Sequence, residues 1–432
     1  MSSLLLGAML VAAGWAWPRY GGGLVVEVPG PVTTHDPAQA SSLPDVLAAS
    51  LTHRPLLVSS EGQLVPDLLA AVPQGDGTGK TFLLRLRPEL RFADGTSLDA
   101  AALKGSLVRL LAQTNVAAAR VVTAGMAPER LEVLDEQTLQ VTLDPPDRAF
   151  PYRLALLAAS PRSASGFGAG PFFHEPGGGG DAVVGANLWD VEGRPFLDRV
   201  VLRAARSRRE SRLAALQGEL DVRCGVDGLG RGNLPVVTER ALVLRAAPEL
   251  AEREVWLQML ASREGLLSLR EALGARVMSG AQFARALPRQ AEVHLAVDED
   301  SPVARLVAQR LQLNAHALGR AVVLGAGEAG GVEELSLHEV VAPPLDTSLT
   351  AALALPPDEA AALTNAVAKA PEQARALELA AGVGVLLRQP VRCSVPAAAT
   401  IDEGSSQLTS RHMLVDAVDP LGNLTLERAW WR

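Results

Sequence analysis

The sequence is poor in aromatic residues and has more acidic than basic side chains. Phe, Trp and Tyr make up 4% of its 432 residues. This scarcity argues against stacking platforms for single-stranded nucleic acid, and the excess of 48 acidic over 40 basic residues would repel phosphate backbones. We therefore expect no nucleic-acid partner.

Cysteine is also scarce, since Cys224 and Cys393 are the only two. Two cysteines cannot form the disulfide framework of a small secreted domain. Two buried thiols are the simpler interpretation, and a single bond formed in an oxidising compartment is the alternative.

Patterns typical of metal binding and catalysis are missing. The seven histidines show no i, i+4 pair and no zinc-ligand spacing, so we expect no metal and no cofactor. No Gly-x-Ser-x-Gly motif occurs, and adjacent carboxylates such as Asp135 and Glu136 point apart on a regular element. The run Gly75–Thr81 lacks the P-loop spacing and precedes a strand, which predicts a hairpin turn. The chain is therefore expected to bind a ligand and not to be an enzyme.

The N-terminus carries an uncharged apolar run from Leu4 to Trp17. Its length is typical of the core of an export signal and is shorter than a bilayer span. Gly14 and Ala16 suit cleavage before Trp17, which makes residues 1–16 a signal peptide. No Lys or Arg precedes the run, so a misassigned start codon or a core helix is the alternative. No later apolar run reaches about 18 residues, and we expect a soluble periplasmic protein after cleavage.

The chain length predicts two to four domains of mixed α/β class. Alternation over Lys80–Arg87 indicates a half-buried strand with Phe82, Leu84 and Leu86 on one face. Thr96 followed by Asp99 resembles a capping box at the start of a helix. Leu131–Leu143 predicts two short strands, and an apolar helix is expected after Pro145-Pro146, as far as Ser160.

Further patterns predict alternating strands and helices in the second half. Arg209–Gln217 is expected to be a helix ended by Gly218. Ala291–Gly325 predicts strand, helix and parallel strand, with Ser301 as the N-cap. Two more helices are expected between Pro357 and Leu387.

Several segments also resemble one family, in the family's order. Phe82–Ala100 is similar to a signature reading Phe-x-Leu-Arg and then Phe-x-Asp-Gly-x-Pro-x-x-Ala. Gly168–Phe172 resembles Gly-Thr-Gly-Pro-Tyr, and Ala215–Val222 resembles Leu-x-x-Gly-Glu-x-Asp. His35-Asp36-Pro37 lies where members carry Leu-Asp-Pro, and Asn187-Leu-Trp189 resembles Asn-x-x-Trp. The chain thus resembles the family 5 extracellular solute-binding proteins, which serve ABC importers of peptides, dipeptides and nickel.

This resemblance implies an α/β fold of the periplasmic-binding-protein type, with two lobes around a cleft. The first lobe would be discontinuous, over 17–40, 165–232 and 396–432, with a subdomain inserted at 41–164. The second lobe would be 233–395. A monomer would capture a small, peptide-like solute by closing the lobes, and would deliver it to a permease of the inner membrane.

Departures from the family pattern leave the ligand class open. Members are usually longer, and the shortfall lies mainly in the second lobe. The segment Leu335–Pro344 stands where members often show Trp-x-x-Asp-Tyr. The alternative is a diverged member without a transport role that acts as a sensor, scaffold or partner-binding protein. An enzyme on this fold is a third alternative.

The resemblance also implies candidate site residues. His35 and His53 of the first lobe, with Trp256, His338 and Glu339 of the second, would reach the cleft. For each histidine a purely structural position is the alternative, and for Trp256 plain core packing. Cys224 and Cys393 would lie near the hinge, where a disulfide is a hypothesis that requires a Cα separation below about 7 Å.

Overall fold

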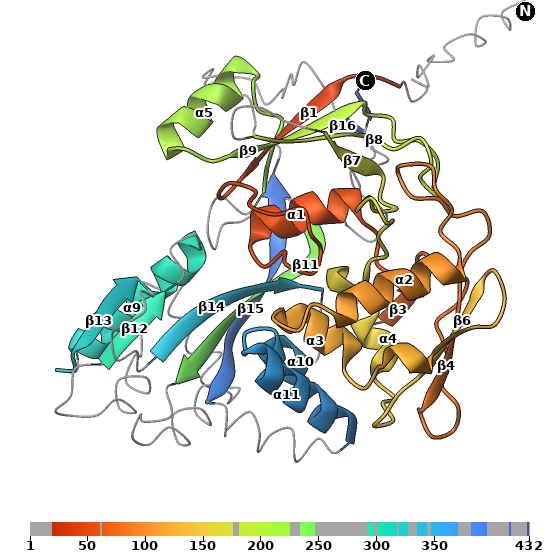
Figure 1. Cartoon of the computed structure of the whole chain (residues 1–432). Helices are drawn as coiled ribbons and strands as arrows, with labels where there is room; N and C mark the ends of the chain where they lie inside the picture. Colours follow the sequence, from red (N-terminus) through yellow and green to blue (C-terminus); the bar gives the residue numbers. More distant parts are fainter. Residues whose placement is uncertain are drawn as a thin grey trace, which may run out of the picture.

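Figure 1 shows the computed structural model of the chain. The structure describes residues 20–60, 63–175, 181–224, 234–246, 293–297, 301–317, 319–326, 335–343, 347–369, 382–394, 414–415 and 430–431. Trp256 and residues 1–19, which include the expected signal peptide, lie outside the described residues.

The first lobe is a five-stranded half of a mixed sheet. Its order is β10 (Val222–Cys224), β1 (Gly23–Val28), β9 (Arg199–Ala204), β8 (Ala182–Ala186) and β7 (Phe172–Glu175). On β1 the alternate residues Leu24, Val26 and Val28 are at most 2% exposed, because they face the core of the lobe. Two helices belong here, α1 (Leu43–Thr52) and α5 (Arg208–Gln217). Gly218 ends α5 with a left-handed φ of 74°, which confirms that predicted helix end.

The inserted subdomain combines a small sheet with short helices. Its sheet has the order β4 (Thr81–Arg85), β6 (Thr138–Thr142), β5 (Leu131–Val133), and β2 (Leu57–Ser60) pairs with β3 (Gln63–Pro66). Its helices are α2 (Ala100–Leu111), α3 (Ala117–Thr123) and α4 (Phe150–Arg153), with 3-10 turns at Pro128–Arg130 and Leu157–Ala159. Phe82 and Leu84 are buried and Leu83 is exposed, as the alternation predicts. The run after Gly75 is a turn, in which Asp76 accepts hydrogen bonds from Thr78 and Lys80.

Two predictions in this subdomain are wrong in detail. The N-cap of α2 is Asp99, whose carboxylate accepts from the Ala102 amide at 2.7 Å, whereas Thr96 donates its hydroxyl to Asp94 in the preceding turn. The single helix expected before Ser160 is broken into α4 and a 3-10 turn. Arg153 is the last residue of α4 and is 1% exposed. Its buried guanidinium is stabilised by an ion pair with Asp147 at 2.9 Å and by hydrogen bonds to the carbonyls of Val121 and Ala124.

The second lobe holds the other half of the sheet. Its order is β13 (Val322–Ala326), β12 (Val293–Val297), β14 (Leu335–Ala342), β11 (Leu234–Ala246) and β15 (Val383–Ser394). Its described helices are α9 (Pro302–Ala317), α10 (Thr347–Ala352) and α11 (Pro357–Lys369). Parallel β12 and β13 around α9 confirm the predicted strand–helix–strand unit. Of the two helices expected between Pro357 and Leu387, α11 confirms one. Residues 370–381, between α11 and β15, lie outside the described residues.

The two halves form one ten-stranded sheet that is continuous where the lobes meet. β15 pairs with β11 along most of its length and with β10 at its end. There Cys224 is the register partner of Cys393, and Cys224 is disulfide-bonded. Residues opposite each other in an antiparallel pair have Cα atoms about 4.5–5.5 Å apart, which is within disulfide range.

Two helices pack across the expected boundaries between the lobes and the subdomain. Helix α1 contributes Ala48 to the buried core of β1, β8 and β9 in the first lobe. In addition, α3 of the subdomain shares a buried core with the second lobe, in which Val121 and Val122 lie with Leu349 and Leu363. The subdomain therefore bridges the lobes through apolar contacts.

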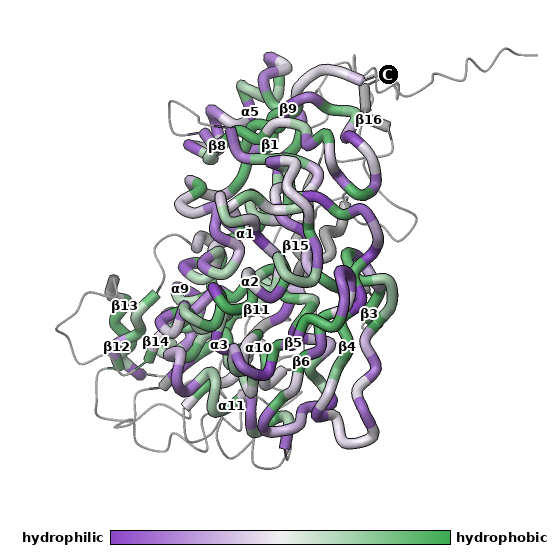
Figure 2. The backbone as a smooth tube through the Cα atoms, turned by 45° about the vertical axis from the view of Figure 1, so that its right-hand side comes forward, coloured by the Kyte–Doolittle hydropathy of each residue, from purple (hydrophilic) through white to green (hydrophobic). Residues whose placement is uncertain are grey.

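The views in Figures 1 and 2 agree on how these parts are arranged. The first lobe lies at one end, and the subdomain and second lobe lie side by side at the other. Hydrophobic residues, green in Figure 2, concentrate along β12 and β13 and along β5 and β6. None of the helices in the described ranges combines the length and the apolar character needed to cross a membrane.

Candidate ligand-binding site

A cavity of about 310 Å³ lies where the first lobe, the subdomain and the second lobe meet. Its walls are mainly small apolar side chains, contributed by Pro37–Ser41, Val46, Ser50, His53, Pro55, Val58, Ser59, Val116–Ala118, Ala155–Ala158, Glu339–Pro343 and Leu353. The volume is at the low end of the range for small-molecule sites, roughly 300–1,000 Å³. The cavity therefore suits a small solute better than an extended oligopeptide.

The first-lobe wall depends on the start of helix α1. Ser42 caps the helix by accepting from the Asp45 amide at 3.3 Å. The buried Asp45 carboxylate in turn accepts from the Thr33 amide at 2.6 Å and from its hydroxyl at 2.9 Å. These bonds hold the loop that carries Pro37–Ser41 against the helix.

His53 follows the last residue of α1 and is 4% exposed. Its Nδ1 lies 2.9 Å from the Thr52 hydroxyl, which donates to the Ala48 carbonyl at 3.1 Å. The Thr52 hydroxyl has a single hydrogen, which it donates to the Ala48 carbonyl. It must therefore accept a hydrogen bond from Nδ1–H of His53. Nε2 is then an acceptor, and it is buried without a hydrogen-bond partner among the described residues.

Burial also keeps His53 neutral. Desolvation, followed by the nearby positive charge of Arg162, lowers the pKa of His53 to about 4. At neutral pH the imidazole therefore offers a lone pair to the cavity and no charge.

Two glycines of the Gly168-Ala-Gly170 segment allow the chain to pass close to this histidine. A Cβ at Gly168 would lie 2.2 Å from the Thr52 carbonyl oxygen, and one at Gly170 would lie 2.5 Å from the Thr52 carbonyl carbon. The Gly170 amide donates to the Thr52 carbonyl at 3.1 Å. The glycines are thus explained by close backbone contact with the end of α1.

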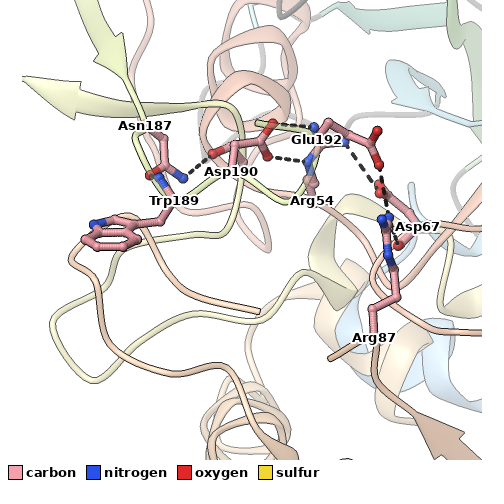
Figure 3. A network of polar contacts seen from close by, with 8 residues as sticks. Arg54, Asp67, Arg87, Asn187, Trp189, Asp190 and Glu192 are labelled. Carbon is pink, nitrogen blue, oxygen red and sulfur yellow. Dashed lines mark hydrogen bonds and ion pairs between the residues drawn. The ribbon is translucent and has the colours of Figure 1, made fainter. Parts of the chain in front are cut away.

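Arg54 follows His53 in the chain and forms ion pairs with residues of the first lobe and the subdomain (Figure 3). Its guanidinium binds both oxygens of buried Asp190, at 2.9 and 3.0 Å, and contacts Asp67 at 3.4 Å. Asp190 follows the Asn187-Leu-Trp189 motif of the resemblance. Within the motif, the Asn187 side-chain amide donates to the Gly170 carbonyl at 2.7 Å, which is a structural role. Desolvation raises the pKa of Asp67 in the Arg54 network.

The second-lobe wall contributes a carboxylate. Glu339 lies on β14, and its Oε2 accepts a hydrogen bond from the hydroxyl of Ser301. Ser301 is buried at the N-terminus of α9 and also accepts from the Ala304 amide at 3.0 Å. The helix start thereby orients the carboxylate at the cavity.

The structure brings together His53 and Glu339 of the candidate residues, and it places two others elsewhere. His338 bonds to Ser336 at 2.9 Å, on the face of β14 opposite Glu339. His35 stacks on His174 with ring centroids 3.7 Å apart. Trp256 lies outside the described residues.

Sequence reasoning missed the alanine-rich walls and the role of Ser301. Alanines at 117, 118, 155 and 158 carry no chemical signal, because their contribution is the space they leave. The sequence predicts Ser301 only as an N-cap, and its hydrogen bond to Glu339 depends on tertiary structure. Within the described part of the chain, no group of three or more His, Cys, Asp or Glu side chains is placed to hold a metal ion.

Comparisons with known proteins support the resemblance. Residues 63–231 match the family model for the middle part of the bacterial extracellular solute-binding proteins, family 5. The glutathione-binding protein GsiB of Salmonella paratyphi A is 26% identical over 272 residues, which are 58% of this chain and 51% of that protein. The chain thus spans about half the length of the curated relative that it matches.

Solved structures share the fold. NikA of Staphylococcus aureus, in complex with Ni(L-His)2, superposes with a TM-score of 0.65 at 12% identity, over 95% of this chain and 100% of that one. DppA of Helicobacter pylori, in complex with the peptide STSA, gives 0.63 at 15% identity, over 96% and 99%. At these identities the likeness establishes the fold and not the ligand. The chain therefore has the two-lobed α/β fold of these binding proteins, and its residues 63–231 match the model for the middle part of the family 5 extracellular solute-binding proteins.

Proposed function

We propose that this protein is a periplasmic receptor that captures a small, peptide-like solute between its lobes and delivers it to an ABC importer permease. The observation that carries the proposal is the 310 Å³ cavity, whose walls come from both lobes and include His53 and Glu339. A solute bound there contacts both lobes at once. Its binding free energy would then favour the closed arrangement that a permease recognises.

The polar groups of the cavity define the kind of solute. His53 Nε2 can accept a hydrogen bond, and the Glu339 carboxylate is a second acceptor. The surrounding wall is apolar. The matching solute has an apolar body and a donor group, such as the ammonium of a hydrophobic dipeptide.

A titration of the purified chain with the dipeptide Leu-Leu, and with its N-acetylated form, tests this proposal. We expect Leu-Leu to bind saturably and the acetylated form to bind at least tenfold more weakly, since acetylation removes the ammonium. Glu339→Gln should raise the Kd for Leu-Leu about tenfold, which corresponds to about 1.4 kcal/mol. The matched control is Glu132→Gln on the exposed edge of the subdomain. Equal affinities for the two forms would contradict the assigned role of Glu339.

A second function is favoured by the apolar contact between the subdomain and the second lobe. Val121 and Val122 share a buried core with Leu349 and Leu363, and burial of that core opposes separation of these parts. A member whose lobes stay together would act as a sensor or partner-binding protein and not as a transport receptor. Small-angle X-ray scattering distinguishes the two functions. A radius of gyration that decreases on solute binding supports the transport receptor. A radius of gyration that is unchanged at saturating solute supports the sensor or partner-binding protein.

A further inference from the structure

A second, smaller cavity lies behind the wall of the proposed solute site. Its volume is about 130 Å³, and it is enclosed by the Asp36–Ala38 turn, by helix α2 and its following residues, and by residues 158–166. These walls belong to the first lobe and the subdomain. Pro37, Ala38 and Ala158 line both cavities, but the polar groups of the two sites are different.

Three polar atoms of this cavity are buried without a hydrogen-bond partner in the described structure. They are the Ser160 hydroxyl, Nε of Arg162 and Oε1 of Gln113. Ser160 is 4% exposed. Each buried polar atom that lacks a partner costs about 1–3 kcal/mol, so three in one small space indicate that something polar occupies it.

The surrounding contacts hold these atoms in place. Arg162 pairs with Asp36 through Nη1 at 2.8 Å, and its amide donates to the Ser106 hydroxyl at 3.0 Å. Arg109 donates to the carbonyl of Arg162 and, at 3.4 Å, to that of Ser163. The Gln113 side-chain NH2 donates to Asp36 at 3.4 Å, so the other end of the amide, Oε1, is the atom left for the cavity.

The arrangement of donors and acceptors identifies the chemical class of the occupant. Arg162 Nε–H and the Ser160 hydroxyl need an acceptor, and the two guanidinium groups that line the cavity outnumber its one carboxylate. Gln113 Oε1 needs a donor. We infer that the cavity binds a small carboxylate with an adjacent hydroxyl or amino group, the carboxylate on Ser160 and Arg162 and the adjacent donor on Gln113.

The volume agrees with this class. About 130 Å³ corresponds to roughly four water molecules at about 30 Å³ each, which is the size of glycolate or glycine and smaller than a dipeptide. The site is therefore distinct from the proposed solute site and does not depend on its function.

The test is calorimetric titration of the full chain with glycolate, glycine, acetate and acetamide. We expect glycolate or glycine to bind saturably, acetate at least fivefold more weakly because it lacks the second donor, and acetamide not to bind because it lacks the charge. Ser160→Ala should raise the Kd for glycolate at least tenfold. Gln113→Leu should weaken glycolate binding until its Kd equals that of acetate. The control Gln137→Leu, at an exposed position, should leave the Kd of glycolate and the Kd of acetate unchanged.

Three outcomes would overturn the inference. If none of the four probes binds saturably, the cavity holds water only. If acetate binds as tightly as glycolate, or if Ser160→Ala leaves glycolate binding unchanged, the assigned contacts are wrong. Ala118→Phe, which fills the larger cavity, should block Leu-Leu and leave glycolate binding intact, so failure of one site is separable from failure of the other.

Discussion

The neutral, buried state of His53 makes the stability of the protein depend on pH. The pKa of His53 is about 4 in the folded chain, against 6.5 for an unperturbed histidine. Since the folded-state value is the lower one, the unfolded chain takes up the proton first as pH falls. Stability contributed by neutral His53 is therefore present above about pH 6.5 and is lost as pH falls toward about 4.

The size of this effect follows from linkage. One pKa unit corresponds to about 1.36 kcal/mol, so a single site with these two values loses about 2 kcal/mol of unfolding free energy by about pH 5. Because His53 is only 4% exposed, solvent screening reduces this loss little. The loss is a large fraction of the roughly 5–15 kcal/mol that stabilises a typical protein.

The substitution His53→Asn tests this. Asparagine keeps a donor near the Nδ1 position for the Thr52 hydroxyl, and it does not titrate. Urea unfolding at pH 7.5 and pH 5.0 should show that the wild type loses about 2 kcal/mol more than His53→Asn between the two conditions. The control is His294→Asn, at an exposed residue of β12, which should behave like the wild type. If His53→Asn and the wild type lose equal stability, the assignment of a buried neutral imidazole is refuted.

Two further substitutions test the packing that supports the site. Gly170→Ala places a Cβ 2.5 Å from backbone of Thr52 and should destabilise the fold by about 3 kcal/mol in thermal unfolding, whereas Gly77→Ala, with open space around its Cβ, should have little effect. Equal melting temperatures for Gly170→Ala and the wild type would show that the backbone near Thr52 accommodates the added Cβ without loss of stability. Asp147→Asn leaves the Arg153 guanidinium buried without its counter-charge and should cost about 3–5 kcal/mol in urea unfolding; a cost below about 1 kcal/mol would mean that the carbonyl contacts of Arg153 suffice.

Local patterns predicted much of the fold. The alternation through Phe82 and Leu84, the Gly218 helix end and the strand–helix–strand unit around α9 all follow from short-range rules of burial and turn chemistry. The errors occur where tertiary contacts decide. The N-cap at Asp99 displaces Thr96, because Thr96 is already used by the Asp94 turn.

Long-range packing explains the rest of what sequence reasoning missed. Helix α1 packs against β7 and β8 of the first lobe, and no local pattern in the sequence predicts this contact. His53 and Glu339 were singled out by their place in a family pattern, and His338 next to Glu339 faces the other side of the strand. The register of β14 decides which of the two side chains faces the cavity, and no local sequence pattern predicts that register.

The central claim is that the cavity between the lobes binds the solute, and a thermal-shift titration with a blocked variant tests it most directly. The panel comprises Leu-Leu, other hydrophobic dipeptides, glutathione and Ni(L-His)2. Wild type and Ala101→Phe, at an exposed position of α2, should show a saturable rise in Tm with at least one of these solutes, and Ala118→Phe should show none. A rise that persists in Ala118→Phe, or the absence of any rise in the wild type, would contradict the account.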